Sequence, residues 1–421
     1  METTDNFIIL YPHAAGIDCG SKEHVVAIGQ HKERDVKRFG TFTENLIALC
    51  VWLKENHITH VAIESTGSYW QVLYFMLYDY DMTPFLVQPN HVKNPVNEKT
   101  DPKDARWLQK LMSCGLLNNS FQPDDETEEL RTLMRERKSL VQQKTRCVQK
   151  MNKMLLLMNI RLDQVQCRNN NKGPMRIIEA ICNGERNPNT LMQLFYRQGK
   201  AIATEEQKLM SLHGQWNDEY IFVMKEELNH HRFIEKQIAS FDKRIVKMIE
   251  TRMKEKMRQN PKLKNYHPVK KTNNTGNNDV PIAADKVVYT LSGGIDIGAI
   301  YGVGNNLLLT LLSEVGLDLK SKFKTEKQFV SWLHLCPNLK MSGGKILSGK
   351  TRHYHNALKT AFRDSANRMK NSANFLGVFF RRVQIRKGYK CAVTATARKL
   401  AIVVYRMLTR HEQFMPVTVV A

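Results

Sequence analysis

The chain has 421 residues, which is enough for two to four domains, and 42% of them are hydrophobic, which is enough for well-packed cores. It carries 63 Lys and Arg residues against 41 Asp and Glu residues, and this formal net charge of +22 favours a polyanionic partner, most commonly nucleic acid. The first residues lack the basic n-region of a secretory signal, and no apolar run is long enough to span a bilayer. The eight cysteines show no CxxC pair and no Cys/His spacing typical of a zinc finger. We therefore expect a cytoplasmic protein with reduced thiols rather than a secreted or membrane-spanning protein.

Residues 14–89 alternate between strand-like and helix-like segments. Five segments are short and β-rich, and two have helical spacing of apolar residues. Three strands followed by strand–helix alternation predict an α/β domain built on one central sheet. The expected strands are AAGIDC, HVVAIGQ, VKRFGTF, THVAIEST and TPFLVQP, and the expected helices are ENLIALCVWLKEN and YWQVLYFMLYDY.

The pattern is helical from about residue 124 to residue 260. Apolar residues, Leu133, Leu140 and Met151 among them, recur near helix or heptad spacing with charges between them. The two long helices expected here are either core helices of a bundle or a coiled coil that joins subunits. Residues 260–281 are polar and Asn-rich and are typical of a linker.

A helical and strongly basic domain is expected to follow the linker. Between residues 338 and 410 the chain has seventeen Lys or Arg residues and one acid, Asp364. Between residues 251 and 271 it has eight Lys or Arg residues and one acid, Glu255. Clustering of this kind is expected where a protein neutralises phosphates.

Four acids stand where carboxylates can meet. Asp18 and Glu64 end predicted strands, while Asp101 and Asp104 stand three apart where a helix begins, on one face of that helix. Four carboxylates facing one spot require cations, and oxygen ligands suit Mg²⁺ or Mn²⁺, two of which can stabilise both oxygens of a phosphoryl transfer. Each acid also has a simpler explanation: Asp101 as a helix N-cap, Asp104 as a first-turn acid favoured by the helix dipole, and Glu64 as a turn residue.

Two glycine-containing motifs follow the linker. Gly302 and Gly304 open a helix whose N-terminal N–H groups can hold a phosphate, in a pattern that looks like a helix-hairpin-helix element or, alternatively, an ordinary loop. Ser342 precedes two glycines that allow a phosphate to approach closely, although the same residues also suit a surface turn. Ser348 is a rival serine in a similar context. Positive charge for a phosphate is supplied by Lys345, Lys350 and Arg352.

The segments HAAGIDCGSKEHVVAIG, IESTGSYW, HVKNPVNEKTDPKDARWLQKLMSCGLL and SWLHLCPNLKMSGGK together resemble transposases of the insertion-sequence-110 family, which include relatives of the pilin-gene invertase. The resemblance implies an RNase H-like (RuvC-like) domain with a D-E-D-D metal tetrad, a long helical or coiled-coil middle, and a mainly α C-terminal domain with a helix-hairpin-helix-like element. The expected boundaries are 1–120, 121–260, a linker at 261–286, and 287–421. The tetrad would be Asp18, Glu64, Asp101 and Asp104, and the catalytic serine would be Ser342. Tyr301 departs from the proline that the family often has there.

The sequence is therefore interpreted as a DNA transposase or site-specific recombinase of an insertion sequence, located in the cytoplasm and associated with the nucleoid. It would use Mg²⁺, or Mn²⁺, and a covalent phosphoserine intermediate. The resemblance further implies donor and target DNA, a structured noncoding guide RNA (the bridge RNA) and a homo-oligomer, from dimer to tetramer, as partners. Two alternatives stay open: a metal-dependent Holliday-junction-type nuclease without serine chemistry, and a non-catalytic nucleic-acid-binding protein.

Overall fold

The structure, a computed structural model, divides the chain into two compact units, Met1–Gln122 and Pro123–Ala421. We describe each unit by itself. The residues that the structure describes are 8–30, 32–65, 67–88, 100–165, 172–195, 203–268, 276, 278–351 and 354–415.

The first unit is a mixed sheet of five strands with helices on both faces. The strand order is β3-β2-β1-β4-β5, in which β1, β2 and β3 pair antiparallel while β1, β4 and β5 pair parallel. This arrangement fits the expected RNase H-like α/β domain, and the seven elements predicted over residues 14–89 are present. The elements are β1 (Ala14–Cys19), β2 (Glu23–Ala27), η1 (Glu33–Asp35), β3 (Val36–Gly40), α1 (Thr43–Glu55), β4 (His60–Glu64), α2 (Trp70–Asp79), β5 (Thr83–Val87) and α3 (Asp101–Ser113).

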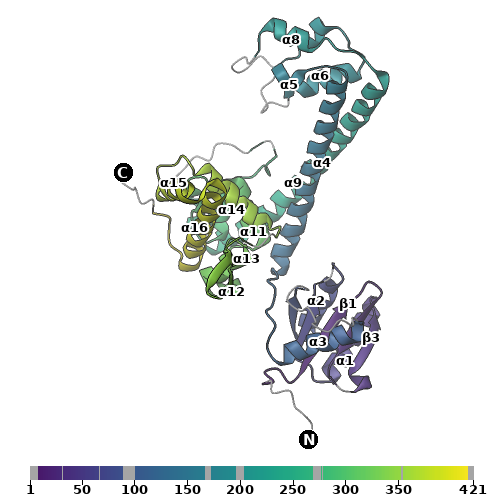
Figure 1. Ribbon diagram of the computed structural model, residues 1–421, viewed down its shortest axis with the longest axis vertical. Coiled ribbons are helices and arrows are strands. Elements are labelled where there is room, and N and C mark those ends of the chain that lie inside the picture. Colours follow the sequence, from purple (N-terminus) through teal and green to yellow (C-terminus); the bar gives the residue numbers. More distant parts are fainter. Residues whose placement is uncertain are drawn as a thin grey trace. The chain divides into compact units, whose positions relative to one another are not determined.

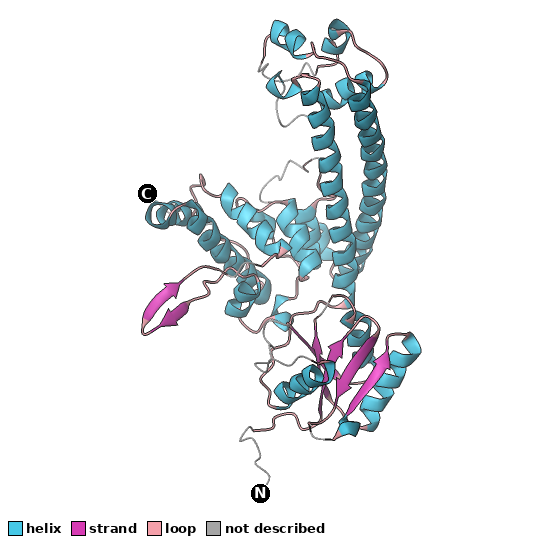
Figure 2. Ribbon diagram, turned by 45° about the vertical axis from the view of Figure 1, so that its right-hand side comes forward, coloured by secondary structure: helices cyan, strands magenta, loops and turns pink. Residues whose placement is uncertain are grey.

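The two faces of this sheet have different roles. Helices α1 and α2 cover one face and form the largest apolar cluster of the unit with inward residues such as Ile17 and Ile63. Helix α3 packs on the other face, where Ala14 and Ala62 meet Leu108 (Figures 1 and 2). Because side chains alternate along a strand, the residues between the inward ones point toward α3.

The second unit is mainly helical and is organised around two long helices, α4 and α9. They lie side by side, and α5 to α8 close one end of the pair around an apolar cluster that includes Met151 and Leu228 (Figures 1 and 2). Both long helices were predicted, and the structure pairs them within one chain. These elements are α4 (Asp125–Leu157), α5 (Leu162–Val165), α6 (Lys172–Cys182), α7 (Pro188–Met192), α8 (Glu205–Ser211) and α9 (Asp218–Gln259).

The remaining helices pack against each other and against the long pair. Glu314 of α11 is buried and forms a 2.7 Å ion pair with Arg135 of α4, which fixes α11 on that helix. The expected mainly helical character holds, with one addition: β6 and β7 form a hairpin that the sequence interpretation did not include. The elements are η3 (Pro261–Lys264), α10 (Ala284–Leu291), η4 (Ile297–Ala299), α11 (Asn305–Glu314), α12 (Leu319–Lys322), α13 (Glu326–Trp332), β6 (Lys340–Ser342), β7 (Lys345–Ser348), α14 (Ala357–Arg368), α15 (Phe375–Lys387) and α16 (Tyr389–Arg410).

No helix within the described ranges is long and apolar enough to cross a membrane.

Candidate active site

Helix α3 crosses strand β1 at Gly16 with almost no space between the two backbones. A Cβ atom at Gly16 would lie 2.3 Å from the carbonyl oxygen of Ala105 and 2.3 Å from the backbone nitrogen of Gln109. Such distances exclude any side chain, so the crossing requires glycine. This close approach holds the first turn of α3 against the sheet face that carries the acids of β1 and β4.

Asp18 and Glu64 are neighbours on adjacent parallel strands. Ile17 lies opposite Ile63 in the β1–β4 register, so the next residue of each strand is an acid. Both acids point to the face covered by α3, because Asp18 is two residues beyond Gly16 and Glu64 is two residues beyond Ala62. Asp18 and Glu64 are each partly buried there.

Asp101 and Asp104 occupy the first turn of α3. The N-cap position belongs to Thr100, whose side chain makes no capping bond, so the N-cap explanation for Asp101 is wrong. Pro102 lies in the first turn, where its missing N–H costs no helical hydrogen bond. A favourable interaction with the helix dipole still applies to both acids.

The pKa of Asp18 depends on its burial and on the charges of the other three acids. Burial, followed by repulsion from Glu64, Asp101 and Asp104, raises the pKa of Asp18 from 3.8 to about 6. Burial and the charges of Asp18 and Glu64 also raise the pKa of the adjacent Cys19 thiol, which therefore stays protonated at neutral pH. A carboxylate held among three others is the situation that a bound cation relieves.

Ser342 lies at the tip of the β6–β7 hairpin. It pairs across the turn with Lys345, and the two turn residues, Gly343 and Gly344, have φ values of +52° and +74°. Two consecutive positive φ values are typical of a type I′ turn and favour glycine at both positions. All four residues are exposed, and a Cβ on either glycine would meet nothing within 4 Å. The tip is therefore open to a large ligand.

Ser348, the rival serine, does not lie at the hairpin tip as Ser342 does. Ser348 is at the far end of β7, half-buried, and its hydroxyl accepts a 3.4 Å hydrogen bond from the Lys350 backbone N–H. The side chain of Lys350 is exposed, whereas Arg352 lies outside the described residues.

The Gly302–Gly304 turn precedes α11 and has a packing explanation of its own. Gly302 has a φ of +84°, and a Cβ there would lie 2.8 Å from the Met369 side chain. Gly304 is the N-cap of α11, and the guanidinium of Arg368 would lie 3.0 Å from a Cβ at that position. Glycine is thus favoured at 302 by the positive φ and by the Ser365 carbonyl oxygen 3.0 Å from the place of a Cβ, whereas at 304 only the movable end of the Arg368 side chain is close.

Two family models match the chain, and together they cover just over half of it. A model for the DEDD transposase of IS110, described as a transposase, matches residues 15–160, and the model described as the transposase IS116/IS110/IS902 family matches residues 297–376. The chain belongs to the IS110 family of transposases. No curated protein matches the chain.

Membership of this family makes the chain an insertion-sequence transposase, an enzyme that cuts and rejoins DNA. The first match contains Asp18, Glu64, Asp101 and Asp104, which belong to the first unit. The second match contains Gly302, Gly304, Ser342 and Lys345, which belong to the second unit. In the first unit the other three acids each act electrostatically on Asp18, and in the second unit Ser342 pairs with Lys345 across the hairpin turn.

The transposase has a further charged residue beside the acids that the sequence interpretation missed. Arg38 of β3 forms an ion pair with Glu23, and its guanidinium lies 4.0 Å from a carboxylate oxygen of Asp101. The strand register explains this position, because Asp18 lies opposite Val25 and Val25 lies opposite Arg38 in one row across three strands. The position of Arg38 beside the acids could therefore be predicted only from the pairing of β1, β2 and β3, because no short sequence motif indicates it.

Proposed function

We propose that this transposase cuts and rejoins DNA with Mg²⁺ at the carboxylate cluster and forms a covalent phosphoserine intermediate at Ser342. The observation that supports the metal part is that Asp18 and Glu64 lie side by side on adjacent parallel strands, facing α3. Burial, followed by repulsion from Glu64, Asp101 and Asp104, raises the pKa of Asp18 to about 6. The carboxyl oxygens of these four residues fit Mg²⁺, or Mn²⁺ in its place. When bound, such ions supply charge stabilisation for phosphate oxygens.

The serine step conserves the energy of the phosphodiester bond. The Ser342 hydroxyl oxygen forms an ester bond to the DNA phosphorus, the bond from phosphorus to one deoxyribose oxygen breaks, and the hydroxyl proton ends on that leaving oxygen. A DNA hydroxyl then reverses the step and restores Ser342. Support comes from the exposed hairpin tip, the glycines that admit a phosphate, and Lys345, which pairs with Ser342 across the turn.

Donor and target DNA are the substrates, and a structured noncoding guide RNA selects the target in this proposal. The net charge of +22 supports polyanionic partners. The exposed Lys345 and Lys350 contribute to phosphate binding, together with Arg352, and the turn at Gly302 and Gly304 acts as a helix-hairpin-helix-like contact to the nucleic acid backbone.

We further propose that the chain works as a dimer or tetramer organised by its helical middle, residues 121–260, between the RuvC-like domain at 1–120 and the serine domain at 287–421. The apolar residues Leu140 and Met151 pack inside one chain, against the clusters formed with α9. An assembly would therefore use outward faces of these helices.

The test is a denaturing gel of the protein incubated with Mg²⁺, guide RNA and labelled donor and target DNA that carries a trapping nick. Ser342→Ala should lose the slow-migrating adduct and recombination together, whereas Ser348→Ala should keep both. Asp104→Asn should lose both while nucleic-acid binding persists.

Three outcomes would overturn parts of the proposal. An adduct with Ser342→Ala but none with Ser348→Ala would assign the chemistry to the other serine. Active wild-type protein that never forms an adduct would favour the nuclease alternative. Full recombination by Asp104→Asn would remove the metal cluster from the mechanism.

A further inference from the structure

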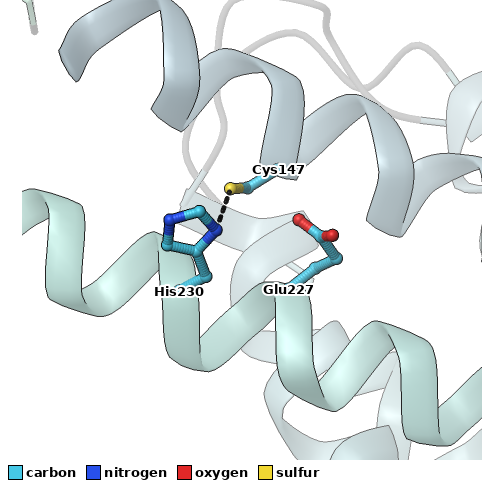
Figure 3. A group of neighbouring side chains, drawn as sticks. All are labelled: Cys147, Glu227 and His230. Carbon is cyan, nitrogen blue, oxygen red and sulfur yellow. Dashed lines mark hydrogen bonds between the residues drawn. The ribbon is translucent and has the colours of Figure 1, made fainter.

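A second cluster of potential metal ligands lies between the two long helices of the second unit. Cys147 projects from α4, while Glu227 and His230 project from α9, one helical turn apart (Figure 3). Their ligand atoms all lie within 4.8 Å of one another, and the Cys147 Sγ and His230 Nδ1 atoms are 3.7 Å apart. The thiol is buried, the carboxylate is half-buried and the imidazole is exposed.

The geometry and the donor types fit a zinc ion. Zinc binds sulfur at about 2.3 Å and imidazole nitrogen at about 2.0 Å, so a tetrahedral site separates these two ligand atoms by about 3.5 Å. The observed Sγ–Nδ1 distance of 3.7 Å is close to that value. A thiolate, a carboxylate and a neutral imidazole carry two negative charges in total, which balances Zn²⁺, whereas a sulfur ligand disfavours Mg²⁺.

The environment of Glu227 is a second observation that favours a cation at this cluster. Its Oε2 atom is buried without a hydrogen-bond partner among the described residues. The Cys147 thiol nearby is at best a weak donor. A buried carboxylate oxygen without a strong partner is costly, and a cation between α4 and α9 would satisfy it.

Lys150 is the present partner of this carboxylate. Its Nζ atom lies 2.6 Å from Oε1 of Glu227, which leaves Oε2 unaccounted for. The Lys150 side chain is 63% exposed, so it can turn into solvent when a cation approaches.

We propose that Cys147, Glu227 and His230 bind one Zn²⁺ ion that fastens α4 to α9. On binding, the S–H bond of Cys147 breaks, a Zn–S bond forms, and the proton leaves to solvent. A water molecule completes the coordination on the side of the exposed His230. The ion would link apolar contacts on both sides of the cluster, Met151 with Leu228 and Leu140 with Ile234.

The test uses the full chain after removal of metals by a chelator. Cobalt(II) serves as a spectroscopic substitute for zinc, because coordination of cobalt by a thiolate gives a charge-transfer absorption that carboxylates do not give. The wild-type protein should show this absorption at one equivalent of Co²⁺, and Zn²⁺ should displace it. Since carboxylates alone cannot produce the signal, ions bound at Asp18, Glu64, Asp101 and Asp104 do not interfere.

Two variants and one control make the assignment specific. Cys147→Ser should lose the absorption. His230→Ala changes an exposed position and leaves the packing between α4 and α9 intact. It should weaken zinc binding more than about 100-fold, since even the loss of a residue that only supports a metal ligand commonly costs about 10–100-fold in affinity. Cys182→Ser, at another buried thiol of the same unit, should bind as the wild type does. The rise in melting temperature that zinc produces should disappear in the first two variants and persist in the third.

The proposal would be overturned by wild-type protein that shows no thiolate absorption with Co²⁺, or by an absorption unchanged in Cys147→Ser. Zinc affinity unchanged in His230→Ala would likewise remove the imidazole from the site. None of these results depends on recombination activity.

Discussion

At the scale of single residues, Gly16 allows α3, which carries Asp101 and Asp104, to pack directly against β1. It is the point where α3 touches β1, with the backbone of Ala105 and Gln109 2.3 Å from the place of a Cβ. Neither neighbour is a flexible side chain end that could turn away. The position of Asp101 and Asp104 relative to Asp18 therefore depends on the absence of a side chain nearly ninety residues earlier in the sequence.

Gly16→Ala should lower the free energy of unfolding by about 2–3 kcal/mol, because overpacking against rigid backbone forces α3 away from β1. Thermal unfolding of the full chain measures the loss, and strand cleavage should fall with it because the acids separate. Gly349→Ala is a suitable control for stability, since the nearest atom to its Cβ would be 3.8 Å away. Equal melting temperatures for the two variants would contradict the close crossing.

Asp18 makes the stability of the metal-free protein depend on pH. Its pKa is about 6 in the folded chain against 3.8 for an ordinary aspartate, so the folded state holds the proton more tightly than the unfolded state. The contribution of this residue to stability is therefore fully present below about pH 4 and is lost as pH rises through 6.

Asp18→Asn should stabilise the metal-free protein at pH 7 by about 1–2 kcal/mol, allowing for solvent screening of a partly exposed cluster, and should have little effect at pH 4. Melting curves in a chelator at both pH values measure this difference. Asp81→Asn, at an exposed position of the same unit, should show no such pH dependence. A gain for Asp18→Asn that is equal at both pH values would exclude relief of charge repulsion as its cause.

At the scale of elements, the sequence predicted the first unit well because its signals are local. Strands of β1, β4 and β5 are short apolar runs bounded by turn residues, and α1 and α2 have clear helical spacing. The sequence predicted Asp18 and Glu64 near the ends of strands and Asp101 and Asp104 at the start of a helix, and the structure has them at the ends of β1 and β4 and in the first turn of α3. A shared metal site at these four acids stays a prediction. Arg38 could not be predicted, because its position follows from the register of three strands rather than from its neighbours in sequence.

The second unit was predicted less completely, because several of its features depend on contacts that are distant in sequence or on weak local signals. The hairpin β6–β7 was missed because its strands are short and exposed, so they lack an apolar alternation, although the Gly343–Gly344 pair is a turn signal. The long helices α4 and α9 were predicted, but a heptad-like pattern does not reveal whether the partner helix is in the same chain. The proximity of Cys147 to His230 has the same origin, since 83 positions separate them in sequence.

Met151→Ser should lower the free energy of unfolding by about 3 kcal/mol or more, because Met151 is fully buried between α4, α9 and the small helices at their end. Leu156→Ser, on the same helix but 48% exposed, should change stability little. Chemical denaturation followed by circular dichroism at 222 nm, a helix signal, measures both. If Met151→Ser instead lowered only the mass in light scattering, its side chain would pack between chains.

At the scale of the whole molecule, the charge is concentrated rather than spread. Seventeen Lys or Arg residues and one acid lie between residues 338 and 410. Arg382, Arg386, Lys387 and Lys390 are exposed around the junction of α15 and α16, which gives the transposase a dense basic surface there. A surface of this kind binds phosphates without regard to base sequence, and each contact releases counterions.

Affinity for DNA should therefore fall steeply with salt, by about 1000-fold between about 50 and 200 mM if roughly six phosphates are contacted. Replacing both Arg382 and Arg386 by alanine should reduce the slope of log affinity against log salt by about 2, because each lost phosphate contact removes about 0.9. Arg161→Ala is the matched control: its guanidinium is paired with Asp163 at 3.0 Å, so its removal should leave the slope unchanged. Fluorescence anisotropy of labelled duplex DNA over a salt series measures all three proteins. A slope that is the same in the double variant and in the wild type would place the phosphate contacts on another face of the molecule, and an affinity independent of salt would remove charge as the basis of binding altogether.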